Sequence, residues 1–253
     1  DVIKGKDPLD STTVESPPLD LPLQKGEKEG VDLKGLKVGV PKEYFIDGMD
    51  KETEKRVREG IDQLKKLGAE IVEISLPYSP YALAVYYILQ PAEVSANLAR
   101  YDGIRYGYSD KSAKNLEELY NKSRGGGFGP EPKRRIMIGT YVLSAGYADA
   151  YYKKAQAVRT LVKRDFDDAF LKVDCIVTPT SPTPAWPLGE RMDDPLQMYL
   201  ADIFTVSANI AGIPGISAPC GKAHGLPVGL QILAPQLRED VVFRVAGVYE
   251  KIT

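Results

Sequence analysis

The sequence predicts an α/β protein with a mixed, mostly parallel sheet flanked by helices. Short apolar segments, such as 36–40 and 71–74, alternate with longer amphipathic segments, and this alternation is typical of that fold class. The two apolar segments 36–40 and 71–74 flank a helical pattern at 51–67. A strand, a helix and a strand within about 40 residues predict a parallel βαβ unit with a right-handed crossover.

The composition is typical of a globular protein, with 43 % hydrophobic and 27 % charged residues and a net charge of −2. This balance gives no electrostatic reason to expect that the chain wraps nucleic acid. No run of about 20 apolar residues could span a bilayer. Cys175 and Cys220 are the only cysteines, which fits a reducing compartment better than a disulfide framework. We therefore expect a cytoplasmic protein that has no contact with a membrane.

The N-terminal part divides into an arm and a regular segment. Residues 1–30 contain prolines and acids without periodicity, so we expect an extended arm. The helix at 51–67 follows from apolar residues at three- and four-residue spacing. Asp50 is a suitable N-cap for this helix, and Gly68 is a suitable C-terminal cap.

The middle of the chain has a helical pattern with one irregular region. Residues 79–106 predict a helix that is apolar nearly all round, interrupted or kinked at Pro91. Residues 107–134 are polar and irregular, and the glycines of 123–129 predict a flexible loop. Another helix opens at Lys133, and a long helix covers 147–171.

The C-terminal part predicts three further strands. Residues 175–177 form a buried strand before a proline-rich loop. Residues 216–219 and 228–233 have the pattern of strands that are covered on both faces and joined by the loop GKAHGLP. The last helix, 238–251, should turn its valines inward.

No catalytic constellation stands out from the residues alone. His224 is the only histidine, so a Ser–His–Asp triad would have to use it, and a loop histidine beside a glycine is more often solvated. One histidine and two distant cysteines cannot form a tetrahedral zinc site without carboxylates, and no HExxH or CxxC motif occurs. Both cysteines are best interpreted as small buried hydrophobes. We expect no metal site.

Three polar residues stand in apolar surroundings on separate segments: Tyr86, Arg135 and Asp202. A buried charge needs an opposite partner in the protein or in a ligand. An arginine pairs bidentately with a carboxylate, and an aspartate accepts from an ammonium. Together they would hold an α-amino acid by both ends. Arg135 and Asp202 could equally pair with each other, and Tyr86 could be aromatic core filling.

Several blocks of the sequence resemble the amidase-signature family, and within it the A subunits of tRNA-dependent amidotransferases that act on glutamyl-tRNA(Gln). These blocks run through the whole chain in matching order. They are DPLDSTTV, KVGVPKEYF, ANLARYDGIRYGY, KRRIMIGTYVLSAGYADAYYKKAQAVR, VTPTSPTPA, DDPLQMYLADIFT, ANIAGIPGISAPCG and GLPVGLQILAP. The resemblance implies that residues 31–253 are the C-terminal half of an amidase-signature domain, with a helical insertion at roughly 79–146.

The family hydrolyses glutamine with a Ser–Ser–Lys triad, carried on a loop of the type GGSSGGS with the lysine upstream. This sequence contains no such loop, and SRGGGFG lacks its serine-rich context. The resemblance therefore implies no catalytic residue in this chain, which alone should be inactive. It assigns the glutamine-binding positions to Tyr86, Arg135 and Asp202, although Tyr87 is adjacent to the first of them.

The resemblance also implies partners. Ammonia from glutamine would pass to a B subunit, which uses ATP and Mg to activate the glutamate of Glu-tRNA(Gln) for protein biosynthesis. This ligase would be a heterotrimer of A, B and C subunits, with tRNA contacted mainly through the B subunit and no cofactor in the A subunit. Two other interpretations remain: a general amidase fragment, and a non-catalytic module that binds an amino acid or a partner.

Overall fold

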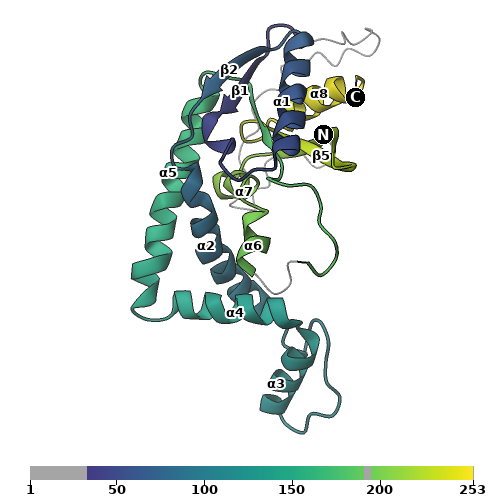
Figure 1. Ribbon diagram of the computed structural model, residues 1–253. Helices are drawn as coiled ribbons and strands as arrows, with labels where there is room; N and C mark the ends of the chain where they lie inside the picture. Colours follow the sequence, from purple (N-terminus) through teal and green to yellow (C-terminus); the bar gives the residue numbers. More distant parts are fainter. Residues whose placement is uncertain (1–32, 191–194, 253) are drawn as a thin grey trace, which may run out of the picture. The chain divides into compact units, whose positions relative to one another are not determined.

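The computed structural model describes residues 33–190 and 195–252 (Figure 1). The arm expected at 1–30 lies outside the described residues. The chain divides into two compact units. We call residues 1–80 with 162–253 the sheet unit, and residues 81–161 the helical unit. In the described part of the chain, no helix is long and apolar enough to cross a membrane.

The sheet unit contains a mixed sheet of five strands, in the order β2-β1-β3-β5-β4. The strands are β1 (Lys37–Pro41), β2 (Glu70–Ile74), β3 (Cys175–Pro179), β4 (Gly215–Ala223) and β5 (Leu226–Leu233). Strand β1 pairs in parallel with β2 and β3, whereas β5 pairs antiparallel with β3 and β4. Of the five described strands, β5 alone therefore runs against the others, which confirms the mixed, mostly parallel sheet.

Helix α1 (Lys51–Lys66) connects β1 to β2, as the βαβ pattern predicts, and both expected caps are present. The Asp50 carboxylate accepts a hydrogen bond from the backbone N–H of Thr53 at 2.8 Å. At the other end Gly68 has a φ of +100°, and the amide after it bonds back to the carbonyl of Leu64. A glycine adopts this left-handed conformation without strain, so it ends the helix cleanly.

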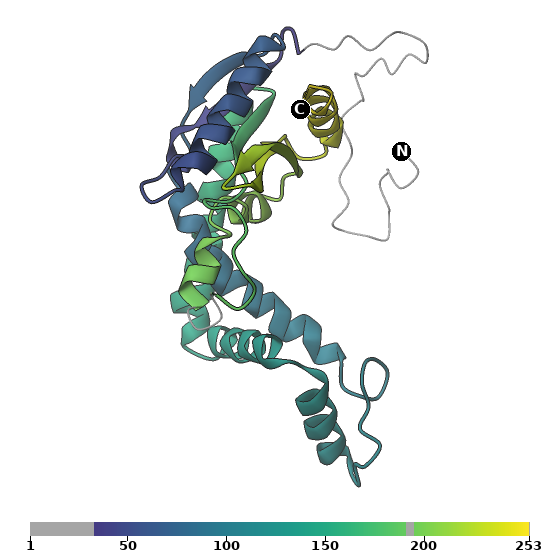
Figure 2. The ribbon, with the colours of Figure 1, turned by 45° about the vertical axis from the view of Figure 1, so that its right-hand side comes forward.

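Helices α1 and α8 (Glu239–Glu250) cover the same face of β4 and β5 (Figures 1 and 2). They meet at Gly60, where an added Cβ would lie 2.8 Å from the Tyr249 hydroxyl and 3.2 Å from the Cys220 Cβ. The absence of a side chain at Gly60 lets the two helices and β4 pack closely. As predicted, the four valines of α8 are buried.

The β4–β5 hairpin differs from the prediction in two ways. The strands extend into the expected loop and leave a two-residue turn, His224–Gly225, in which both φ angles are positive (51° and 81°). This is the geometry that suits the right-handed twist of a tight hairpin. Strand β4 is also not covered on both faces, because Ala218 and Cys220 are buried while Ser217 is exposed. Strand β4 lies at the sheet edge, where α1 and α8 cover one face only.

Short helices complete the sheet unit. They are the 3-10 turns Lys42–Tyr44 and Ser79–Tyr81, and the helices α6 (Pro195–Leu200) and α7 (Val206–Ala211). Helix α7 ends at Gly212, whose φ of 72° is left-handed.

The helical unit is built mainly from α2, α3 and α4. These helices cover Ala82–Asn97, Leu116–Gly127 and Pro130–Leu143. The 3-10 turn Leu98–Arg100 follows α2, and the π-helical turn Ala148–Tyr152 precedes α5 (Lys153–Phe170), which crosses into the sheet unit. Helix α2 runs through Pro91 without interruption.

The prediction of a flexible loop at 123–129 is wrong, because the first five of these residues belong to α3. Asn115 caps this helix by accepting from the N–H of Glu118 at 2.9 Å. Near the other end, the Arg124 guanidinium donates to the carbonyls of Leu98 and Tyr101 at 2.9 and 3.1 Å. These bonds tie the glycine-rich turn to the chain after α2, so the glycines remain helical despite their low propensity.

Helices α2 and α4 pack against each other at their closest point through Gly139. A Cβ added to Gly139 would lie 1.9 Å from the Pro91 carbonyl oxygen, far inside van der Waals contact. Only glycine allows the two backbones to approach this closely. The packing of the helical unit therefore depends on this position.

We expect Gly139→Ala to destabilise the chain by about 1–3 kcal/mol, the usual cost of overpacking, since backbone must move. Urea unfolding measures the change. Gly125→Ala is the matched control, because Gly125 is also helical but has nothing within 4 Å of an added Cβ. That variant should be neutral or slightly stabilising. Equal effects at the two positions would contradict the close approach.

His224 lies at the hairpin turn beside the N-terminus of α1. Its Nε2 is 2.9 Å from the Asp50 carboxylate, and its backbone N–H donates to Glu52 at 3.0 Å. The hydrogen bond to Asp50 raises the pKa of His224. The same bond holds the pKa of Asp50 at about 2. The lone histidine thus links the hairpin to the helix cap.

The pKa shifts give the sign of a pH dependence. Because the pKa of His224 is higher in the folded chain than in the unfolded chain, the protonated histidine stabilises the fold. This stabilisation is complete at a pH below the unfolded-state pKa, near 6.5, and it disappears as the pH rises through the folded-state pKa. Asp50 contributes above its ordinary pKa and loses this contribution as the pH falls toward 2. We expect His224→Asn, which tolerates the left-handed backbone, to lower the unfolding free energy more at pH 5.5 than at pH 8.5.

Urea unfolding at the two pH values tests this expectation. Glu54→Gln is the control, because Glu54 pairs with Arg58 on the same helix at 2.7 Å and has no histidine partner. Its effect should not differ between the two pH values. A pH-independent effect of His224→Asn would exclude the proposed linkage.

Candidate functional site

Arg135 lies on α4 one turn before Gly139, so the close helix packing holds it against α2. Its Nη1 donates to the Gln90 side-chain oxygen at 2.8 Å, and its Nε donates to Glu131 at 2.7 Å. The guanidinium lies 4.9 Å from the centre of the Tyr87 ring. Arg135 therefore points toward α2, as the sequence indicated, with a side chain only 16 % exposed.

Arg135 shares its carboxylate partner with a second arginine. Glu131 forms ion pairs with both Arg134 and Arg135. Two guanidinium groups thus share one carboxylate. Burial acts to lower the pKa of Arg135, but its bonds to Glu131 and Tyr87 outweigh this effect and raise it. A guanidinium held in this way is a suitable partner for a carboxylate of a ligand.

Tyr86 and Tyr87 both lie on α2, but the ring against Arg135 is that of Tyr87. The Tyr86 ring packs edge-on against Tyr87, with centroids 5.2 Å apart. Gln90, one turn further along α2, was not singled out from the sequence. Its signal was a lone amide in an apolar helix, three residues after Tyr87. The role of Tyr86 in ligand binding stays a prediction.

Asp202 lies in the turn between α6 and α7, in the sheet unit. Its backbone carbonyl accepts from the N–H groups of Thr205 and Val206 at 3.0 and 3.1 Å. The prediction that Asp202 lies in apolar surroundings is wrong, because Asp202 is exposed. The apolar neighbours in sequence point elsewhere, since Phe204 and Val206 are buried. Its role stays a prediction.

The turn that carries Asp202 is fixed to the sheet by buried groups. The amide of Gln231, on β5, donates to the Phe204 carbonyl at 3.0 Å and to the Thr178 hydroxyl of β3 at 2.7 Å. The Phe204 ring stacks on Tyr44 with centroids 5.5 Å apart. Burial raises the pKa of Tyr44 to about 12, and its hydroxyl bonds to Ser207. Sequence reasoning missed Gln231, because an amide in an apolar strand gives little pattern.

The other candidate chemistries do not form sites. Among the residues that the structure describes, His224 bonds to two carboxylates and to no serine, which does not fit a Ser–His–Asp triad. Burial raises the pKa of Cys175 to about 12 and that of Cys220 to about 11, so both are neutral thiols and poor nucleophiles. Within residues 33–190 and 195–252, no cluster of His, Cys, Asp or Glu could hold a metal.

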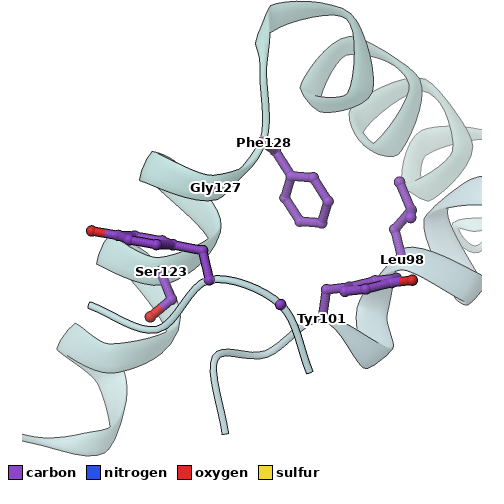
Figure 3. A pocket seen from close by; sticks show the side chains of 7 residues that line it. Leu98, Tyr101, Ser123, Gly127 and Phe128 are labelled. Carbon is purple, nitrogen blue, oxygen red and sulfur yellow. The ribbon is translucent and has the colours of Figure 1, made fainter. Parts of the chain in front are cut away.

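A cavity of about 280 Å³ lies in the helical unit between α3 and the loop that follows α2 (Figure 3). Aromatic side chains and glycines dominate its lining, which consists of Leu98, Tyr101, Gly107, Tyr108, Ser123, Gly127 and Phe128. None of the three residues singled out as a glutamine site lines it. It is therefore a second candidate for binding, separate from Arg135.

Comparisons with known proteins agree with this fold. The chain is 56 % identical over its full length to the A subunit of the glutamyl-tRNA(Gln) amidotransferase of Thermodesulfovibrio yellowstonii, of which it covers 51 %. It is also 56 % identical to the protein of the same name from Koribacter versatilis, over 99 % of the chain and 52 % of that protein. The chain thus spans about half the length of the curated relatives it matches.

Solved structures show the same relationship. The A subunit of the Thermotoga maritima glutamyl-tRNA(Gln) amidotransferase matches with a TM-score of 0.71 and 36 % identity, over 98 % of this chain and 48 % of that one. A crystal structure described as an amidase matches with a TM-score of 0.64 over 87 % of this chain and 46 % of that one. Its 23 % identity supports the fold only. Because the sequence pattern of the Amidase family matches residues 1–243, the chain belongs to the Amidase family.

Proposed function

We propose that this chain is the glutamine-binding half of the glutaminase component of a tRNA-dependent amidotransferase. The observation that carries the proposal is Arg135, a largely buried guanidinium that shares the carboxylate of Glu131 with Arg134. The names of the relatives at 56 % identity support an amidotransferase with Glu-tRNA(Gln) as the acceptor, and the choice of glutamine as the ligand rests on the resemblance described above.

In this proposal Arg135 binds the α-carboxylate of glutamine, and Asp202 accepts from its α-ammonium. Glu131 is the contact of Arg135 that a substrate carboxylate most readily replaces, because this side chain is 44 % exposed and ion pairs of that kind contribute about 0–1 kcal/mol. Gln90 and the Tyr87 ring would keep the guanidinium in place. Tyr86 would line the same pocket.

The chemical step belongs to residues that this sequence does not contain. The family hydrolyses the side-chain amide through an acyl-enzyme on a serine, with a second serine and a lysine handling the proton. We infer that the 253-residue chain binds glutamine without hydrolysing it. In the assembled enzyme, ammonia would pass to a B subunit that uses ATP and Mg, in a heterotrimer completed by a C subunit.

A general amidase is the main alternative function, and the charges argue against it. A neutral amide substrate would bring no carboxylate to pair with the Arg135 guanidinium, so it would gain nothing from this residue. A purely binding module, the other alternative, shares the glutamine contacts but requires no second half. Measurements of glutamine binding and of ammonia release separate these cases.

The first experiment measures glutamine binding to the 253-residue chain by isothermal titration calorimetry. Arg135→Ala should weaken binding about 10- to 100-fold, as expected for a hydrogen bond between charged groups. Arg134→Ala is the matched control, since Arg134 is the neighbouring arginine on α4, pairs with the same Glu131 and is 50 % exposed. It should change binding little. Tighter binding of propionamide than of glutamine would favour a general amidase.

The second experiment measures ammonia release from glutamine by the same chain. We expect no release above the rate in buffer, because the Ser–Ser–Lys loop is absent from the sequence. Adding the serine–lysine half of a relative should restore release if the chain is half of a glutaminase. Turnover by the chain alone would overturn the inference that its catalytic residues lie elsewhere, and no restoration would favour the binding module.

A further inference from the structure

The cavity in the helical unit is walled by flat surfaces. The Tyr101 and Phe128 rings stand nearly perpendicular, at 82° with centroids 6.4 Å apart. The Tyr108 ring packs on the backbone of α3, where a Cβ added to Gly126 or Gly127 would lie 3.2 or 3.3 Å from the Tyr108 side chain. Figure 3 shows the rings of Tyr101 and Phe128 turned toward the space between them. Because the two rings are not parallel, a planar group that enters this slot would stack on one ring face and not between two.

The walls are held in place without a ligand. Arg124 bonds to the carbonyls of Leu98 and Tyr101, and its guanidinium lies 5.1 Å from the centre of the Phe128 ring. The buried Ser123 hydroxyl accepts from the N–H of Asp110 at 2.9 Å, which fixes the far end of the loop to α3. A preformed slot loses little conformational entropy when it binds.

The aromatic side chains around this slot are exposed to solvent. Tyr101 is 47 % exposed and Tyr108 is 57 % exposed, although burial of an aromatic ring is usually favourable. Aromatic faces that are both fixed and exposed are the usual platforms for unstacked nucleic-acid bases. Such stacking accepts any base, because every base has a π-face.

The helical unit, which contains the slot, carries an excess of positive charge. The helical unit contains 12 Lys and Arg residues against 7 Asp and Glu, whereas the whole chain carries −2. Six of these cations are exposed and form no ion pair with any described residue, and four of the six lie in the segment between α2 and α3: Arg100, Arg105, Lys111 and Lys114. The carboxylates of Asp102 and Asp110 stay anionic, but they accept hydrogen bonds from backbone N–H groups of the loop and form no ion pair with these four cations. The cations are thus available to a polyanion.

We propose that this slot binds an unstacked base of single-stranded RNA, with neighbouring phosphates on the four exposed cations. The choice of RNA rests on the proposed function, in which the acceptor is a tRNA. Fixed aromatic faces and accessible cations together fit a nucleic-acid strand better than an apolar peptide, which would use the rings but not the charges. An acidic peptide with an aromatic anchor is the occupant that the experiment must exclude.

The test measures fluorescence anisotropy of a labelled single-stranded RNA decamer with the 253-residue chain at low salt. Tyr108→Ala should weaken binding about tenfold, because base stacking is lost, and Tyr108→Trp should preserve it. Tyr151→Ala is the matched control, because Tyr151 is an exposed tyrosine of the same unit outside the slot. It should bind as the unchanged chain does.

A second pair of variants tests the charges without touching the walls. Lys111→Gln with Lys114→Gln should reduce the slope of log Kd against log salt by about 1.4, the value for two phosphate contacts on a single strand. Lys55→Gln with Lys172→Gln removes two exposed lysines of the sheet unit and should leave the slope unchanged. The tyrosine arm tests the slot, and the lysine arm tests the surface around it.

Four results would overturn the proposal. Three are no RNA binding at about 20–50 mM salt, where such contacts are strongest, equal binding by Tyr108→Ala, and an unchanged salt slope in the Lys111/Lys114 variant. The fourth is binding of a Glu–Tyr copolymer instead of RNA, which would identify a protein-docking surface. Glutamine is absent from this assay, so its failure leaves the glutamine proposal standing. Likewise, if the chain does not bind glutamine through Arg135, the result of the RNA-binding assay is unaffected.

Discussion

Strand β3 is buried at all five positions, and the sheet unit is organised around it. It pairs in parallel with β1 and antiparallel with β5, so it is the strand at which the sheet changes direction. Its buried threonine, Thr178, needs a hydrogen bond, since an unsatisfied buried group costs about 1–3 kcal/mol. Gln231 provides this bond and also holds the Phe204 carbonyl. The Gln231 amide therefore provides a hydrogen bond to the buried Thr178 hydroxyl of the central strand and also fixes the turn that carries Asp202.

Glycine has the corresponding role in the helical unit. At Gly139 the missing side chain leaves room for a backbone carbonyl of α2, and at Gly126 and Gly127 it leaves room for the Tyr108 ring. The first of these contacts sets Arg135 against Gln90, and the second builds one wall of the aromatic cavity. The helical unit thus gives up helix propensity at these positions and gains close packing where two candidate binding surfaces form.

Local pattern predicted the parts of the fold in which one signal dominates. Asp50 and Gly68 cap α1 as expected, because capping is set by adjacent residues. The helix through 123–127 was missed, since its glycines favour a loop and it is held by bonds to distant residues, such as those of Arg124 and Ser123. Arg135 was recognisable as an inward cation from its apolar neighbours. Gln90 and the exposed side chain of Asp202 were not, because both depend on which way a helix or turn faces.

The net charge of the whole chain does not describe how charge is distributed between its two units. A net charge of −2 argues against nucleic-acid binding only if the charges are mixed over the surface. They are not mixed, because the helical unit carries an excess of five positive charges and the rest of the chain an excess of seven negative ones. At physiological salt, charges act over about 8 Å, so a strand bound to the helical unit responds to the local excess. Composition averaged over the chain therefore concealed the difference in net charge between the two units.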